Sequence, residues 1–113
     1  MRRSLLACVF LALALALPAA AGPLPALRLV SDQPLTVRGA HFKPREKVRV
    51  TARVDMTSRS RVVRSTATGT FKVSFDAPMA FDPCLETLRV TAVGARGSDA
   101  MLKLPQRACP PAP

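Results

Sequence analysis

The sequence predicts an all-β domain, an antiparallel β-sandwich of seven short strands. Apolar and polar residues alternate with a period of two at 47–54, 70–75 and 87–92, which is typical of strands with one buried face and one face in water. Turn-forming breaks recur at near-regular spacing, and no stretch shows a helical apolar period. Short strands separated in this way are typical of folds built from two antiparallel sheets.

Each expected strand is an apolar run bounded by turn residues. The runs outside the three alternating stretches are weaker, and we predict them as strands because breaks bound them on both sides. In chain order the breaks lie at Asp32–Pro34, Gly39–Pro44, Thr57–Ser58, Thr68–Gly69, Ala77–Pro83 and Gly94–Gly97. The expected strands are 26–30, 35–39, 46–55, 60–67, 70–76, 86–94 and 99–104. The residues expected to point inward are Leu35, Val37, Phe42, Val48, Val50, Val54, Phe71, Val73, Phe75, Leu88, Val90, Leu102 and Leu104.

The N-terminus predicts export. Arg2 and Arg3 precede the apolar run 5–17, which is too short for a comfortable membrane span and is followed by an Ala-x-Ala site. We expect a signal peptide at 1–21, one domain at 22–109 and a proline-rich tail at 110–113. A lipobox at Cys8 and a twin-arginine signal are weaker alternatives. The expected location is therefore outside the cytoplasm, as a secreted, periplasmic or cell-wall-associated protein.

The segment 37–50 contains the single histidine, His41, and reads as a corner between two strands. Gly39 lets the chain turn out of the first strand, and Phe42 is expected to cover the open end of the core. Pro44 fixes φ for the turn into the second strand. We expect His41 to be a solvated corner residue rather than a general base, because no orienting partner or nucleophile is marked near it.

The same residues resemble a known family. The pattern Val37-x-Gly39-x-x-Phe42-x-Pro44-x-Glu46-x-Val48, the later Gly69-Thr70-Phe71 and the two C-terminal cysteines are similar to small secreted bacterial immunoglobulin-like modules. The likeness covers residues 26–109. It implies an immunoglobulin-like sandwich and supplies no functional residue, because these motifs are structural.

Two cysteines remain after the leader, Cys84 and Cys109, and we predict that they form a disulfide. If 86–94 and 99–104 pair as a hairpin, Leu88 faces Leu104 and Val90 faces Leu102. Continuing that register places Cys84 one position from Cys109, within reach of a disulfide. Exported small domains often carry such a bond, which stabilises a loop of this length by roughly 3 kcal/mol.

The sequence favours a non-enzymatic protein without cofactor or metal. One histidine and two distant cysteines do not make a tetrahedral metal site. An acid pair drawn from the carboxylates is the remaining enzymatic alternative, and the absence of Trp and Tyr argues against a sugar-stacking site. The candidate carboxylates are Asp76, Asp82, Glu86 and Asp99.

The chain carries a formal net charge of +10, and its basic residues are concentrated between 43 and 64. We predict a secreted structural or interaction module of unknown partner, and we interpret the basic stripe first as a solvated, arginine-rich face. The alternative is that the stripe binds polyanions such as cell-wall polymers, acidic polysaccharides or nucleic acid. A secreted inhibitor presenting Arg45 or Arg96 to a protease is another. The expected stripe residues are Lys47, Arg49, Arg53, Arg59, Arg61 and Arg64, with Asp55 facing Arg61 across a Thr57–Ser58 turn.

Overall fold

The fold is all-β, with seven strands and no helix in residues 22–76 and 79–111, the part that the computed structural model describes. The predicted signal peptide lies outside these residues. The strands are β1 (Ala26–Asp32), β2 (Leu35–Ala40), β3 (Lys47–Val54), β4 (Thr57–Arg64), β5 (Phe71–Phe75), β6 (Leu88–Gly94) and β7 (Asp99–Leu104).

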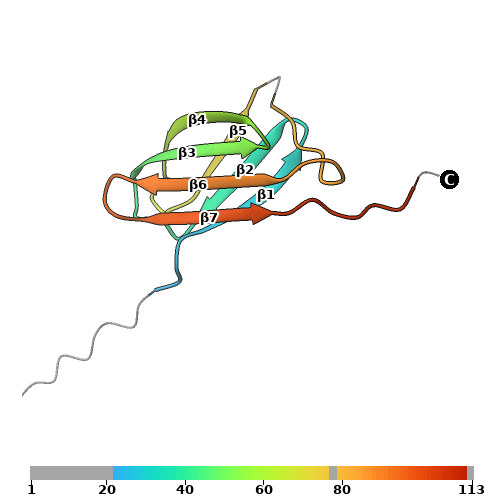
Figure 1. The fold of residues 1–113 in the computed structure, drawn as a ribbon. Helices are drawn as coiled ribbons and strands as arrows, with labels where there is room; N and C mark the ends of the chain where they lie inside the picture. Colours follow the sequence, from blue (N-terminus) through green and yellow to red (C-terminus); the bar gives the residue numbers. More distant parts are fainter. Residues whose placement is uncertain (1–21, 77–78, 112–113) are drawn as a thin grey trace, which may run out of the picture.

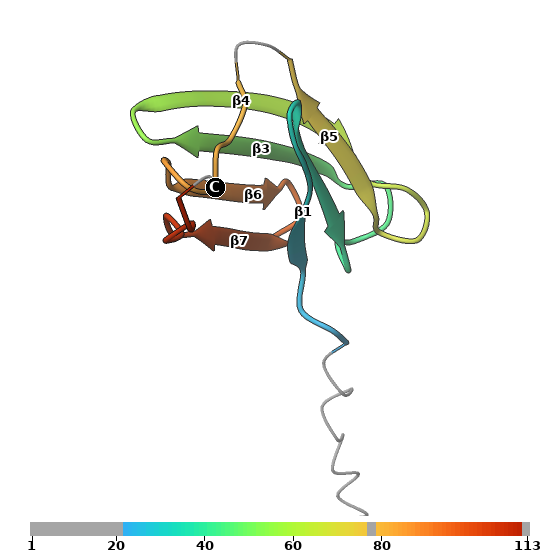
Figure 2. The same cartoon turned by 90° about the vertical axis from the view of Figure 1, so that its right-hand side faces the viewer.

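The strands form two antiparallel sheets that enclose one core. One sheet has the order β1-β2-β5 and the other has the order β4-β3-β6-β7 (Figure 1). Figure 2 shows the strands of the two sheets running in different directions, with β1, β2 and β5 on one side of the larger sheet. The predicted all-β class and the seven strands are confirmed, although β4 begins at Thr57, where a turn was predicted.

The alternation places the core as predicted. In β3 every second side chain, from Val48 to Val54, is buried, and those between face outward. Leu102 and Leu104 are only partly buried, because β7 is an edge strand. Met79 and Phe81, in the long connection that the sequence marked only as a break, complete the core.

Glycine allows close packing at the corner. The ring of Phe71 lies over Gly39, its partner in the β2–β5 register, so that a Cβ at this glycine would overlap the ring. Phe42 packs edge-on against Phe71 with ring centroids 4.9 Å apart, and its backbone N–H donates to the carbonyl of Gly69. Gly69 has a φ angle of 78°, a backbone conformation that residues other than glycine rarely adopt. The corner therefore closes one end of the core.

The β3–β4 hairpin differs from the prediction. Val54 pairs with Thr57, so the turn is Asp55-Met56 rather than Thr57-Ser58. Asp55 has φ of 48°, which aspartate tolerates better than most residues. Because side chains alternate along a strand, this odd shift in register moves each β4 side chain to the face opposite the expected one.

The β6–β7 hairpin and the disulfide are confirmed. Leu88 pairs with Leu104 and Val90 with Leu102, as expected. Beyond the hairpin, Cys84 and Cys109 form a disulfide with their Cα atoms 5.5 Å apart. The bond ties the C-terminal segment to the connection between β5 and β6.

Candidate polyanion-binding face

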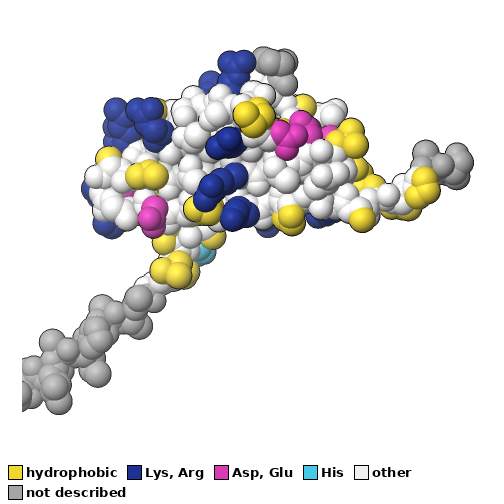
Figure 3. All heavy atoms as spheres, viewed as in Figure 1, with side chains coloured by type: hydrophobic (Ala, Val, Ile, Leu, Met, Phe, Trp, Pro, Cys, Tyr) yellow, Lys and Arg dark blue, Asp and Glu magenta, His cyan; other side chains and the backbone are white. Residues whose placement is uncertain are grey.

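The outer face of the larger sheet carries a concentration of basic side chains. Lys47, Arg49 and Arg53 point outward from β3, and the other strands add one cation each. Figure 3 shows Lys and Arg side chains crossing the middle of this face, with more at its left end. We call the following six residues the basic face: Lys47, Arg49, Arg53, Arg64, Arg89 and Lys103.

Three of these cations form a row across neighbouring strands. Arg53 pairs with Arg89, and Arg89 pairs with Lys103, so the row crosses β3, β6 and β7. Like charges directly opposite each other in a sheet destabilise it. Fold stability therefore does not explain the row, whereas an anionic ligand would offset the repulsion.

The row lines a hollow of about 590 Å³. The other lining residues are Asp55, Thr87, Leu88, Leu104 and Pro105. Asp55 is the one carboxylate there, and its Oδ1 already accepts hydrogen bonds from the N–H and the hydroxyl of Thr87, at 3.0 and 3.1 Å. The hollow thus combines three cations with an acid that is held by the neighbouring loop.

A smaller hollow lies further along the same face. It measures about 250 Å³ and is lined by Lys47 and Arg49, with Val62 and Val93 beside them. Val62 and Val93 both pair with Arg49, and each is about half exposed. Here an exposed guanidinium stands between two exposed apolar side chains.

The cations at this end of the face are held without being neutralised. The Nζ of Lys43 donates to the carbonyl of Arg96, and the guanidinium of Arg96 donates to the carbonyl of Pro44. Arg64 donates to the carbonyl of Arg45 at 2.9 Å. A carbonyl oxygen orders a cationic side chain but leaves its net charge in place.

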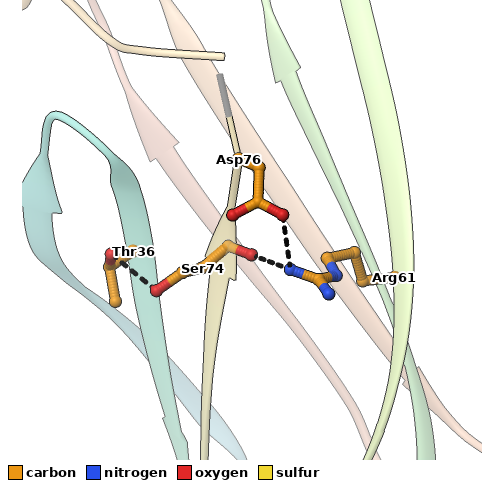
Figure 4. A network of polar contacts seen from close by, with 4 residues as sticks. All are labelled: Thr36, Arg61, Ser74 and Asp76. Carbon is orange, nitrogen blue, oxygen red and sulfur yellow. Dashed lines mark hydrogen bonds and ion pairs between the residues drawn. The ribbon is translucent and has the colours of Figure 1, made fainter. Parts of the chain in front are cut away.

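Arg59 and Arg61 do not belong to the basic face, contrary to the prediction. They pair with Ala52 and Val50, so they lie on the opposite side of β4 from the outward cations. Arg61 reaches β5, where it donates to the carbonyl of Ser74 and lies 3.8 Å from Asp76 (Figure 4). This is the single ion pair in the described ranges. Of the expected β4 residues, only Arg64 shares the face of Lys47.

Sequence reasoning missed Arg89 and Lys103 as site residues. They are distant from the basic segment 43–64 in the chain, and only the register of β6 brings them beside Arg53. Their mutual pairing follows from the predicted β6–β7 hairpin, so that part of the row could have been found.

Sequence reasoning also missed Glu46, a fully buried carboxylate beneath the basic end. Its oxygens accept from the N–H groups of Arg96, Ser98 and Lys43, at 2.6, 3.4 and 3.3 Å. Burial alone would raise the pKa of Glu46, but the Ser98 hydroxyl and these N–H groups together hold the pKa below its usual value. Glu46 therefore joins the corner to the β6–β7 turn as a carboxylate.

A second row of three cations lies on the other sheet. Arg28 pairs with Arg38, which pairs with Lys72 across β1, β2 and β5. None of them lines the larger hollow. This row has the same charge and the same in-register arrangement, which makes it a matched control.

Three of the four carboxylates that the sequence left as an acid-pair alternative are engaged in local contacts, and the fourth, Asp99, is exposed on β7. Asp82 accepts from the N–H of Cys84, Glu86 accepts from the N–H of Asp82, and Asp76 faces Arg61. His41 is exposed, with φ of 64°. The described residues contain no cluster of three or more potential metal ligands, and no helix in that part of the chain is long and apolar enough to cross a membrane.

Comparisons of the chain with protein-family models, with curated proteins and with solved structures found no match.

Proposed function

We propose that the protein is a secreted, non-enzymatic interaction module with an immunoglobulin-like fold, and that its basic face binds anionic polymers. The observation that carries the binding proposal is the hollow lined by Arg53, Arg89 and Lys103. Its cations face one another across three strands without an ion-pair partner among the described residues. A negatively charged group placed there would be attracted by all three side chains.

The sheet topology supports the immunoglobulin-like assignment. When the strands are lettered in chain order, the sheets become A-B-E and D-C-F-G. The constant-type immunoglobulin arrangement has A-B-E-D opposite C-F-G. The fourth strand, β4, has thus moved to the other sheet and pairs with β3.

Export is supported by the disulfide and by the leader-like N-terminus. Disulfides form and persist mainly in oxidising compartments. The Cys84–Cys109 bond is compatible with such a compartment, and the sequence 1–21 has the order of features of a signal peptide.

We favour anionic polymers over a protease target because of the conformation of Arg96. An inhibitor needs an extended side chain that enters the protease pocket. The guanidinium of Arg96 instead folds back onto the carbonyl of Pro44.

Retention on an immobilised sulfated polysaccharide tests the proposal. The triple variant Arg53→Gln, Arg89→Gln, Lys103→Gln should elute at lower salt than the triple variant Arg28→Gln, Arg38→Gln, Lys72→Gln, which loses the same charge from the other sheet. Equal elution of the two variants would show that only net charge matters. A wild-type protein that is not retained at about 0.15 M salt, where surface charges are partly screened, would refute the proposal.

A further inference from the structure

We infer that the preferred ligand of the basic face is a linear acidic polysaccharide that lies along β3, with one carboxylate in each of the two hollows. This inference rests on the proposed function and names the class of polymer. It depends on four features: the spacing of the hollows, the residues between them, the exposed apolar residues of the smaller hollow, and the lack of aromatic side chains on the described part of this face.

The two hollows lie along one strand. Arg49 lines the smaller hollow and Arg53 the larger one, and both point outward from β3. Four residues of strand span about 13 Å. A flexible polymer with a repeating charge can therefore place anionic groups in both hollows while it follows the strand direction.

The surface between the hollows is uncharged and carries hydroxyl groups. Thr51 pairs with Thr91 on β6 and with Ser60 on β4, and the hydroxyls of Thr51 and Ser60 lie 2.8 Å apart. Met101, paired with Thr91, adds an apolar side chain that is 53% exposed. Hydroxyls and exposed aliphatic groups suit a sugar ring, which presents both hydroxyls and C–H faces.

The exposed apolar residues of the smaller hollow point to the same ligand. Val62 is 48% exposed and Val93 is 59% exposed, and they flank Arg49 on both sides. An inorganic polyanion would gain nothing from these contacts. The C–H groups of a sugar would remove their surface from water, which is favourable.

Among the described residues, this face offers no aromatic ring on which nucleobases or sugar rings could stack, so a sugar would be contacted only by the hydroxyl and aliphatic groups named above. Phe42, Phe71, Phe75 and Phe81 are all buried, and the sequence contains neither Trp nor Tyr. Proteins that bind single-stranded nucleic acid rely on exposed aromatic rings for base stacking. Nucleic acid could use only the cations here, so it should bind through charge alone.

Calorimetric titration of the purified protein with oligogalacturonates of increasing length tests the inference. Once the oligomer is long enough to reach both hollows, the second contact becomes intramolecular. We expect affinity to rise by at least about tenfold at that length. Galacturonate monomer should bind weakly, and duplex DNA of equal total charge should bind less tightly than the long oligomer.

Variants locate the two contacts. One variant removes the cations of the smaller hollow, Lys47→Gln with Arg49→Gln. The other removes those of the larger hollow, Arg53→Gln with Arg89→Gln and Lys103→Gln. Each variant should abolish the step in affinity with oligomer length. The control Arg28→Gln, Arg38→Gln, Lys72→Gln should keep it. All these side chains are exposed on strands and none is in the core, and circular dichroism checks that each variant is folded.

The outcomes separate the inference from the proposed function. A smooth rise of affinity with charge, or equal binding of duplex DNA, would overturn the two-hollow inference and leave polyanion binding intact. A step in affinity that survives both variants of the basic face would also overturn it. If no polyanion binds, both the inference and the proposed function fail.

Discussion

Replacing Glu46 by glutamine tests how the buried carboxylate holds the corner to the β6–β7 turn. Glutamine has nearly the same shape, but one carboxylate oxygen becomes an NH₂ group that donates. The N–H of Arg96 and the N–H of Lys43 donate to different oxygens of Glu46. One amide oxygen can replace only one of these acceptors, so a buried N–H would then face another donor.

The size of the loss follows from the contacts. A hydrogen bond to a charged group contributes about 1.5–3 kcal/mol, and leaving a buried donor without an acceptor costs about 1–3 kcal/mol. Glu46 is 0% exposed, so water does not replace the lost acceptor without a local opening. We therefore expect Glu46→Gln to lower the free energy of unfolding by about 2–4 kcal/mol.

Urea unfolding followed by circular dichroism measures this loss. In a domain of this size, each kcal/mol corresponds to roughly 4–8 °C in Tm, so thermal unfolding should show a large shift. The control is Asp99→Asn, an exposed carboxylate on β7, which should change stability by less than about 0.5 kcal/mol. A loss below about 0.5 kcal/mol for Glu46→Gln as well would refute the reasoning.

The pH dependence gives an independent check. The folded-state pKa of Glu46 is lower than the unfolded value of 4.5, so its contribution is fully present above that value and is lost as pH falls through the folded pKa. Wild-type stability should therefore fall below about pH 4.5 more steeply than that of Glu46→Gln. Parallel curves for the two proteins across this acid range would contradict the assignment.

Three further predictions concern the fold. Cys84→Ser breaks the bond to Cys109 and should lower the free energy of unfolding in urea by about 3 kcal/mol. Adding reductant to the wild-type protein should have a similar effect, and no change in either case would contradict a structural role for the disulfide. Gly69→Ala should destabilise the fold by about 2–3 kcal/mol, because φ is positive there and the new Cβ would meet the backbone oxygen of Phe42. Gly22→Ala, which lies in open space, should be neutral, and equal effects of the two substitutions would contradict this explanation. Arg61→Ala should cost less than about 1 kcal/mol, since its ion pair is exposed, and a larger loss in the same assay would show a stronger link between β4 and β5.

The alternation of β3 shows how much the sequence could predict. Val48, Val50 and Val54 were placed inward by period two, and the same parity assigns Glu46 to the interior. The carboxylate was missed because a charged residue at a strand start is usually exposed. Two of the N–H groups that donate to Glu46, those of Arg96 and Ser98, come from the β6–β7 turn. No local sequence pattern connects this turn to the corner.

The candidate site depended on three strand registers of different origin. The β6–β7 register follows from a short hairpin and was predicted correctly, and the same register sets Arg89 opposite Lys103. The β3–β4 register depends on which residues form the turn, and choosing Thr57-Ser58 put Arg59 and Arg61 on the wrong face. The β3–β6 register is long-range and no turn sets it, so the row through Arg53 required the structure.

The central claim, that anionic polymers bind the outer face of the larger sheet, is tested most directly by an NMR titration. Amide resonances of the ¹⁵N-labelled protein would be followed as oligogalacturonate is added. The account predicts shifts concentrated at Arg49, Arg53, Arg89 and Lys103 and their neighbours on β3, β6 and β7, with little change along the row at 28, 38 and 72. Shifts centred on that second row, or spread evenly over both sheets, would contradict it.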